Sequence, residues 1–331
     1  MNGFWMVVRL LVAGGIIWFL LSHGKLDLTL FLDGSLHFDI LFVALLFNLI
    51  LISIGAIRWR ILLISQQIDL PFSWIHAMTY LTICFNLFIP GSVGGDAFRM
   101  AYVAKQLPER RGVAILTVFA DRVIGLYGLL CLCLVGLLLN GSLVFSVTPL
   151  LIMTLSVAAL VVGIPVLLLF FLFFLPRIPR LRAYVQSPPA NRMGRMVAAL
   201  AETLRLFMAA KGLVLLALLV SVVGQAMGVF SLAWIAKGLD RMVIPLEGFF
   251  VAAPLAWIAN VLPISPGGLG VGEAAFDQLC HWLQPVETAA GFGSIFLINR
   301  IVQMVASLPG LGVYILLRQP KPSTSLHSGQ K

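Results

Sequence analysis

Charged side chains are scarce in this 331-residue sequence. Only 11% of the residues are Asp, Glu, Lys or Arg, whereas 60% are hydrophobic, and the mean hydropathy is +1.04. A soluble fold could not cover so much apolar surface, so lipid is the expected solvent for most of the chain. No stretch is long and polar enough to fold as a separate soluble enzyme domain.

Cysteine and histidine are also few, with four and five residues respectively. Cys131 and Cys133 lie two residues apart on an expected helix and therefore point away from each other. The histidines lack metal-ligand spacing, and no glycine-rich loop ends in Lys-Ser or Lys-Thr. The sequence therefore predicts no disulfide framework, no metal, no cofactor and no ATP hydrolysis.

The net charge of +9 does not by itself indicate a nucleic-acid partner. No basic segment accompanies a module that reads a groove or stacks on bases, so no nucleic acid is expected. In a membrane protein, basic loops record orientation and contact with anionic headgroups.

Eight apolar windows predict the membrane segments. Six are suited to cross about 30 Å of hydrocarbon, including the first, which lacks a good signal-peptide cleavage site. The windows 72–90 and 246–264 instead end in a proline–glycine break and run into a short, half-polar helix. The predicted fold is an all-α polytopic membrane protein with about six full spans and two re-entrant broken-helix segments. The windows are 4–22, 38–64, 72–90, 112–139, 149–175, 212–236, 246–264 and 291–317.

The distribution of Lys and Arg predicts the orientation. With the N-terminus in the cytoplasm and both broken segments re-entrant, the outer face holds only Lys25, Lys237 and Arg241. Arg122 and Arg300 lie within spans, and the remaining Lys and Arg residues face the cytoplasm. This agrees with the positive-inside rule. The expected location is the inner (cell) membrane, with both termini cytoplasmic.

Two segments are expected on the cytoplasmic face. The segment 176–211 combines a loop rich in proline and arginine with a basic amphipathic helix at the membrane interface. A structural anchor is the expected role of this helix, with lipid sensing as the alternative. The tail 319–331 is short and polar and is expected to be disordered.

A glycine-rich motif occurs twice. PGSVGGDAF begins at Pro90, and PGGLGVGEAAF begins at Pro266. At a similar distance, each is followed by a span with an arginine, Arg122 in the first case and Arg300 in the second. An odd number of full crossings per half would insert the second half upside down, as in inverted-repeat transporters. The predicted repeats are 1–140, with the re-entrant motif 72–105, and 149–318, with the re-entrant motif 246–284.

The two motifs predict a binding site for negative charge. Prolines end helices, and glycines permit tight turns and close approach of a ligand to the backbone. New helices are expected to begin near Asp96 and Glu273, where N–H groups without partners favour anions. Each acid could cap its helix, accept a cationic headgroup or take up a proton. The predicted substrate-binding residues are Pro90, Gly91, Gly94, Gly95, Asp96, Arg99, Asp121, Arg122, Pro266, Gly267, Gly268, Gly270, Gly272, Glu273 and Arg300.

Arginine inside a span is costly, at roughly 2.5–3.5 kcal/mol on insertion scales, and usually faces a pathway. A guanidinium also suits a phosphate or a carboxylate, which favours a functional role for Arg122 and Arg300. The alternative is that each only fastens the fold, Arg122 through Asp96 and Arg300 through Glu273. Neutral side chains could add hydrogen bonds or join helices: Gln225, Asn260, Asn299 and Gln303.

Arg58, Trp59 and Arg60 close the second window on the cytoplasmic side. The arginines are expected to reach headgroups and the tryptophan to anchor the chain at the interface. The alternative is a gate through which an anionic lipid enters.

These motifs resemble the lysylphosphatidylglycerol synthase transmembrane-region family, and the resemblance covers about 4–318. The family implies an inner-membrane protein that moves phospholipids, aminoacylated lipids or polyprenyl-linked lipids between leaflets. Its two-domain members carry a soluble synthase after the membrane region. No such domain follows Arg318 here, so lysyl transfer is expected to need a separate enzyme. The resemblance rests on Arg58-Trp59-Arg60, Pro90-Gly91, Gly94-Gly95-Asp96, Arg99, Asp121-Arg122, Pro263, Pro266-Gly267-Gly268-Leu269-Gly270, Gly272-Glu273 and Arg300.

The sequence thus predicts a lipid translocase, not an enzyme, that is independent of energy or driven by an ion gradient. Its expected partners are lipids with anionic headgroups and a separate enzyme that modifies lipids or transfers sugars, and the oligomeric state stays open. One alternative is a component of an intramembrane glycosyl- or aminoacyl-transferase. Others are a small-anion transporter and a non-transporting partner of a cell-envelope complex.

Overall fold

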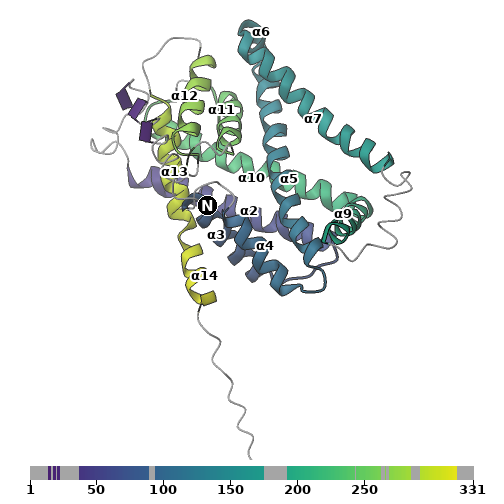
Figure 1. Cartoon of the computed structure of the whole chain (residues 1–331). Coiled ribbons are helices and arrows are strands. Elements are labelled where there is room, and N and C mark those ends of the chain that lie inside the picture. The colour runs from purple at the N-terminus through teal and green to yellow at the C-terminus, as the bar shows by residue number, and fades with distance from the viewer. Residues whose placement is uncertain are drawn as a thin grey trace, which may run out of the picture.

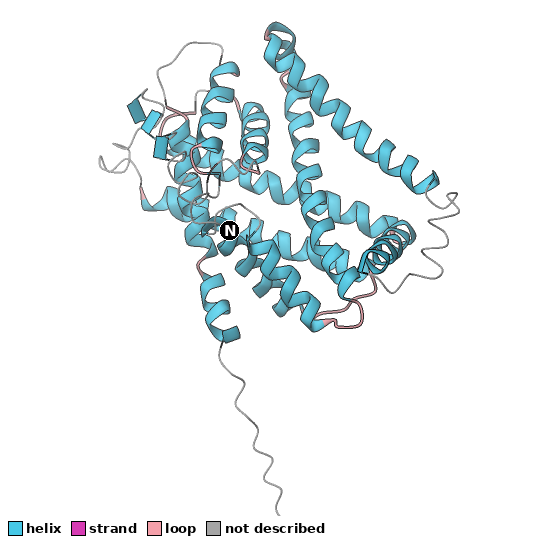
Figure 2. Cartoon of the chain, viewed as in Figure 1, coloured by secondary structure: helices cyan, strands magenta, loops and turns pink. Residues whose placement is uncertain are grey.

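The computed structural model describes residues 14–15, 18–19, 21–22, 37–88, 94–174, 192–242, 244–261, 265, 268–284 and 291–318. Every long element in this part of the chain is a helix (Figure 2), as predicted. Most of the window 4–22, the proline- and arginine-rich loop before residue 192 and the tail 319–331 lie outside the described residues. The helices are α2 (Phe38–Ser65), α3 (Phe72–Phe88), α4 (Gly94–Gln106), α5 (Arg111–Leu139), α6 (Gly141–Ser146), α7 (Thr148–Phe174), α9 (Arg192–Ala209), α10 (Lys211–Gly238), α11 (Leu246–Ala259), α12 (Val271–Trp282), α13 (Gly293–Ser307) and α14 (Pro309–Arg318).

Five segments of the described chain are long and apolar enough to cross a membrane. They are α2, α5, α10, the part of α7 from Thr148 to Leu167, and α13 with α14 from Gly293 to Ile315. At about 1.5 Å per residue, the 28 residues of α2 exceed the thickness of the hydrocarbon core. The protein is therefore a multi-pass membrane protein. In contrast, α11 is apolar but has only 14 residues.

The centre of the molecule is the antiparallel pair of α2 and α10. Gly238 at the end of α10 lies against Ile40 at the start of α2, and Gly224 lies against Ile54. Because glycine has no side chain, these contacts let the backbones of α2 and α10 approach closely. A buried hydrogen-bond chain then joins the pair to α13, from Asn48 Nδ2 to Ser231 Oγ at 3.0 Å and from Ser231 Oγ to Asn299 Oδ1 at 2.7 Å.

Helices α3 and α4 form the first hairpin. At its tip, the backbone N–H of Gly95 donates to Asn86 Oδ1 at 2.9 Å, and a Cβ on Gly95 would fall on the backbone carbonyl of Thr82. At its open end, Arg110 Nη1 donates to the carbonyl of Gln67 at 3.5 Å. The chain therefore enters and leaves this hairpin at the same end of the molecule.

Helices α11 and α12 form the second hairpin. Gly268 and Gly270 have φ angles of 74° and 83°, a region that glycine adopts at little cost. Gly268 and Gly272 also pack directly on the side chain of Asn260, which follows α11. The tip of this hairpin is therefore a tight glycine turn, as the sequence predicts.

The two hairpins enter the molecule at opposite ends of α5. The open end of the first lies beside Arg110, which precedes α5 and donates to Glu202 of α9 at 3.3 Å. The second begins near the other end of α5, where Gly136 packs on the backbone of Phe250 in α11. Both α9 and the open end of the first hairpin therefore lie at one end of the bundle, because Gln66 Nε2 also donates to the carbonyl of Thr203.

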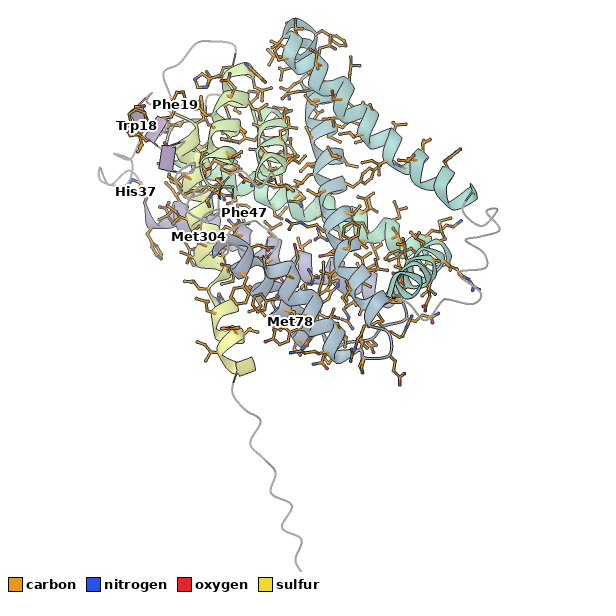
Figure 3. The ribbon with its side chains drawn as sticks, viewed as in Figure 1. Trp18, Phe19, His37, Phe47, Met78 and Met304 are labelled. Atoms are coloured by element: carbon orange, nitrogen blue, oxygen red, sulfur yellow. The ribbon has the colours of Figure 1, made fainter. Side chains whose placement is uncertain are left out.

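Helix α7 runs away from the bundle after α6 joins it to α5 (Figure 1). Pro165 interrupts the hydrogen bonding of α7 because it has no N–H for the carbonyl of Val161. The hydroxyl of Tyr127 in α5 donates to this carbonyl at 2.7 Å. Side chains project outward along α7 (Figure 3). Large apolar ones such as Leu155, Leu167 and Phe170 are exposed, as expected for a helix that faces lipid.

The last window is broken, which the sequence analysis did not predict. Helix α13 ends at Ser307 and α14 begins at Pro309. Proline suits the first position of a helix, where its missing N–H needs no partner. After this break, Gly310 packs on the carbonyl of Tyr80, and α14 lies along α3.

Candidate functional site

Both hairpin tips reach one cavity of about 340 Å³ inside the bundle. Helices α2, α3, α4, α5, α10, α11 and α13 contribute to its wall. Its size is at the lower end of the range for small-molecule sites, roughly 300–1,000 Å³. The charged lining residues are Arg58, Asp96, Arg99, Asp121, Arg122 and Arg300. The neutral polar ones are Thr79, Thr82, Asn86, Gln225, Asn260, Asn299 and Gln303.

Asp121 on α5 binds two arginines from two other helices. Its Oδ1 lies 2.7 Å from Arg58 Nε, and its Oδ2 lies 2.9 Å from Arg99 Nη1. Gly125 leaves the space in which the Arg58 guanidinium lies, because a Cβ there would approach Nη1 to 3.2 Å. The prediction that Arg58 reaches headgroups at the interface is therefore wrong, since its side chain is only 15% exposed and faces the cavity.

Arg99 stacks on a buried tryptophan. Its guanidinium carbon lies 3.5 Å from the centre of the Trp59 ring, and Arg99 is 4% exposed. Trp59 is fully buried, so its predicted role as an interface anchor is wrong. Within the described part of the chain, Arg99 Nε and Nη2 have no hydrogen-bond acceptor. Arg60 is exposed and lies over the ring of Phe72, away from the cavity.

Asp96 and Arg122 form an ion pair, as expected if Arg122 helps to fasten the fold. Asp96 lies in the first turn of α4, where the helix dipole favours a carboxylate. Arg122 Nη1 lies 3.1 Å from Asp96 Oδ2, which joins α5 to the tip of the first hairpin. The Arg122 side chain is 35% exposed, so it combines this contact with access to the cavity.

Arg300 on α13 fastens the second hairpin. Its Nε lies 2.7 Å from Glu273 Oε1, and its Nη2 donates to the carbonyl of Gly268 at 3.2 Å and to Asn260 Oδ1 at 3.3 Å. Glu273 also accepts the backbone N–H of Gly270 at 2.8 Å and so caps α12. Arg300 is thus held on the side of α12 and lines the cavity with the rest of its surface.

The structure brings most of the predicted charged residues together. Asp96, Arg99, Asp121, Arg122 and Arg300 line the same cavity. Glu273 and the described glycines of the second motif lie behind Arg300, while Gly94 and Gly95 begin α4. Gln225, Asn260, Asn299 and Gln303 also line the cavity. Pro90, Gly91, Pro266 and Gly267 lie outside the described residues.

Sequence reasoning missed several lining residues of α3. Thr79, Thr82 and Asn86 are polar residues spaced three to four apart in an otherwise apolar helix, which places them on one face. This spacing was a usable signal. In the described chain, no group of three or more His, Cys, Asp or Glu residues could hold a metal ion. The absence of a metal and a cofactor stays a prediction.

Fold and cavity define a helical, multi-pass membrane protein with buried arginines between two broken-helix hairpins. The family model for the lysylphosphatidylglycerol synthase TM region matches residues 6–310, so this chain belongs to that family. A shorter similarity is to glycosyltransferase AglD of Haloferax volcanii, at 34% identity over 84 residues. That segment covers 25% of this chain and 14% of AglD.

Proposed function

We propose that this protein is a lipid translocase of the inner membrane. Its substrate would be an anionic or aminoacylated phospholipid, or a polyprenyl-phosphate-linked lipid, whose phosphate occupies the cavity while its tails stay in the bilayer. The observation that carries the proposal is a cavity with four arginines between two hairpin tips in an apolar helical bundle. Buried charge of this kind is expensive in a membrane and usually marks a pathway.

The cavity offers hydrogen-bond donors and positive charge that can replace the hydration a phosphate loses when it leaves water. Guanidinium groups form charge-assisted hydrogen bonds to phosphate oxygens, and amide side chains such as Asn86 and Gln303 can bind the rest of a headgroup. The proposal assigns no covalent step to the protein, because moving a headgroup across a bilayer needs only compensation for its desolvation.

Entry of the hairpins at opposite ends of α5 supports an inverted repeat of 1–140 and 149–318. In such proteins, one repeat rocks against the other around a fixed central site, which opens the site to each leaflet in turn. The re-entrant path of both hairpins and cytoplasmic termini belong to this proposal. So do the partners, which are anionic lipids and a separate enzyme that modifies lipids or transfers sugars.

Reconstituted vesicles test the proposed function. Purified protein is placed in vesicles that contain phosphatidylglycerol with a fluorescent label on one acyl chain, and an impermeant reductant bleaches the outer leaflet. The protein is expected to expose inner-leaflet lipid to the reductant. The Arg122→Ala/Arg300→Ala double variant is expected to lose this activity, and Arg205→Gln, on the exposed side of α9, is expected to keep it.

Two results would contradict the proposal. Transport that survives the double variant would indicate that the charged cavity is passive, as in a non-transporting partner of an envelope complex. Transport of inorganic phosphate without any lipid movement would indicate a small-anion transporter.

A role in glycosyl transfer is the second candidate, favoured by the similarity to glycosyltransferase AglD. Such an enzyme needs an acid–base pair or a metal beside its donor. Here Asp96, Asp121 and Glu273 are each held by arginine. Consumption of a sugar nucleotide or a lipid-linked sugar donor by the purified protein would favour this candidate over the translocase.

A further inference from the structure

The charges around the cavity do not cancel. Arg58, Arg99, Arg122 and Arg300 face only three carboxylates, those of Asp96, Asp121 and Glu273, in the described part of the wall and directly behind it. Four cations against three anions leave one positive charge. An excess of positive charge deep in an apolar helical bundle favours a ligand that carries one negative charge.

Arg99 is the cavity-lining arginine at which this positive charge is expected to attract a ligand. Asp121 is shared, since Arg58 holds one of its oxygens and Arg99 holds the other. Arg99 therefore shares its ion-pair partner with Arg58, and its Nε and Nη2 have no hydrogen-bond acceptor among the described residues even though Arg99 is only 4% exposed. Two neighbouring N–H groups on one edge of a guanidinium match two oxygens of a phosphate.

No carboxylate of the described cavity is left for a cationic headgroup. Asp121 is bound by Arg58 and Arg99, Asp96 is bound by Arg122, and Glu273 is bound by Arg300 while it caps α12. An ammonium group would therefore meet arginines. The remaining polar wall consists of amides and hydroxyls, which suit the hydroxyl groups of a neutral headgroup.

We infer that the cavity selects a phosphodiester with one negative charge, whose remainder is uncharged and rich in hydroxyl groups. Arg99 binds the phosphate, and the amides and threonines of α3, α10 and α13, with Asn260 after α11, bind the hydroxyl groups. Either a glycerol headgroup on a phospholipid or a sugar on a polyprenyl monophosphate has this chemistry. The inference rests on the proposed function and narrows it, because it excludes aminoacylated headgroups and diphosphates.

Competitive binding measured by native mass spectrometry tests the selection. The purified protein is offered equal amounts of four lipids: phosphatidylglycerol, lysyl-phosphatidylglycerol, a polyprenyl phosphohexose and a polyprenyl diphosphate. Either phosphatidylglycerol or the polyprenyl phosphohexose is expected to bind at least tenfold more than the lysylated lipid and the diphosphate. The one that binds more shows whether the preferred lipid is a phospholipid or a polyprenyl-linked sugar. Equal or preferred binding of the lysylated lipid or the diphosphate would overturn the inference.

Two variants test the role of Arg99 and of the charge balance. Arg99→Gln is expected to bind the preferred lipid at least tenfold more weakly. Arg99→Lys is also expected to bind it more weakly, because an ammonium group cannot donate two parallel hydrogen bonds from one planar edge. Asp96→Asn raises the excess to two positive charges and is expected to increase diphosphate binding several-fold relative to the phosphodiester. A misfolded protein could not produce this gain. Unchanged ratios in Asp96→Asn, or a loss in Arg205→Gln as large as in Arg99→Gln, would overturn the inference.

The vesicle assay separates failure of the inference from failure of the proposed function. Transport of the lysylated lipid without transport of phosphatidylglycerol or the phosphohexose lipid would overturn the inference and leave a translocase. Transport of none of the four lipids would overturn the proposed function, while the binding ratios would still decide which headgroup the cavity prefers.

Discussion

At the residue scale, the buried charges work as interlocked pairs. Asp121 is 4% exposed and joins arginines from α2 and α4, so one carboxylate holds three helices together. Removal of one partner of a buried ion pair leaves the other charge uncompensated, which costs more than the intact pair contributes.

Asp121→Asn is therefore expected to destabilise the protein by roughly 3–5 kcal/mol. Arg58 and Arg99 would keep their charges without a carboxylate between them. Chemical unfolding in detergent measures the change. The matched control is Glu202→Gln, which removes a carboxylate that is 53% exposed and bound to Arg110, and it is expected to cost less than about 1 kcal/mol. Equal effects of the two substitutions would contradict the assigned role of Asp121.

The charged residues of the cavity could be identified from the sequence, but not all of their ion-pair partners could. The Asp96–Arg122 and Glu273–Arg300 pairs could be considered because each motif precedes its arginine in the same order. The contact between Arg58 and Asp121 could not, because the two residues are 63 positions apart and only packing of α2 on α5 brings them together. Trp59 was misplaced because a tryptophan at the end of an apolar window looks the same whether it anchors the chain or lies under an arginine.

At the scale of elements, the first hairpin depends on a glycine where two backbones touch. Gly95→Ala is expected to push α4 away from α3, because the added Cβ would meet the carbonyl of Thr82 instead of a movable side chain. Asp96 and Arg99 would move with α4. We expect loss of lipid transport and a lower unfolding midpoint, measured in the vesicle assay and by denaturation in detergent.

Gly163→Ala is the control for this substitution. Gly163 lies inside α7, where an added Cβ would have nothing within 4 Å, so alanine should leave transport unchanged and stabilise the helix by up to about 1 kcal/mol. If Gly95→Ala behaved in the same way, the close contact at the hairpin tip would not matter for function.

Helix positions were the most predictable part of the fold. The windows 38–64, 112–139 and 212–236 agree with α2, α5 and α10 to within two residues, because long apolar runs have few alternatives in a membrane protein. The helix starts near Asp96 and Glu273 were also correct. The break before Pro309 was missed because hydropathy continues across it, and only the contact of Gly310 with Tyr80 shows why the chain turns onto α3.

At the scale of the whole molecule, the two hairpins should open to opposite sides of the membrane. Single cysteines at Asp69 and Glu109, which flank the first hairpin, are expected to react with an impermeant thiol reagent from the cytoplasmic side. Cysteines at Asp240 and Gln284, which flank the second, are expected to react from the outer side. Labelling of intact and opened cells measures this difference.

The native cysteines provide a favourable background, because Cys84, Cys133 and Cys280 are buried and Cys131 is partly buried. Reaction of Asp69→Cys and Glu109→Cys from different sides would show that the first hairpin crosses the membrane completely. The same result for Asp240→Cys and Gln284→Cys would show this for the second. Either outcome would contradict the inverted arrangement.

In the proposed transport cycle, the contact between Arg99 and Trp59 is expected to affect how fast a lipid is bound and released. An indole covers one face of the guanidinium and a carboxylate holds one of its ends, so the side chain is already ordered before a lipid arrives. Binding of a lipid then orders few additional side-chain torsions of the protein, so a modest interaction energy is enough for binding. A transporter of the proposed kind must also release its lipid, and a rigid site of modest affinity is expected to release the lipid sooner than a site that closes around it.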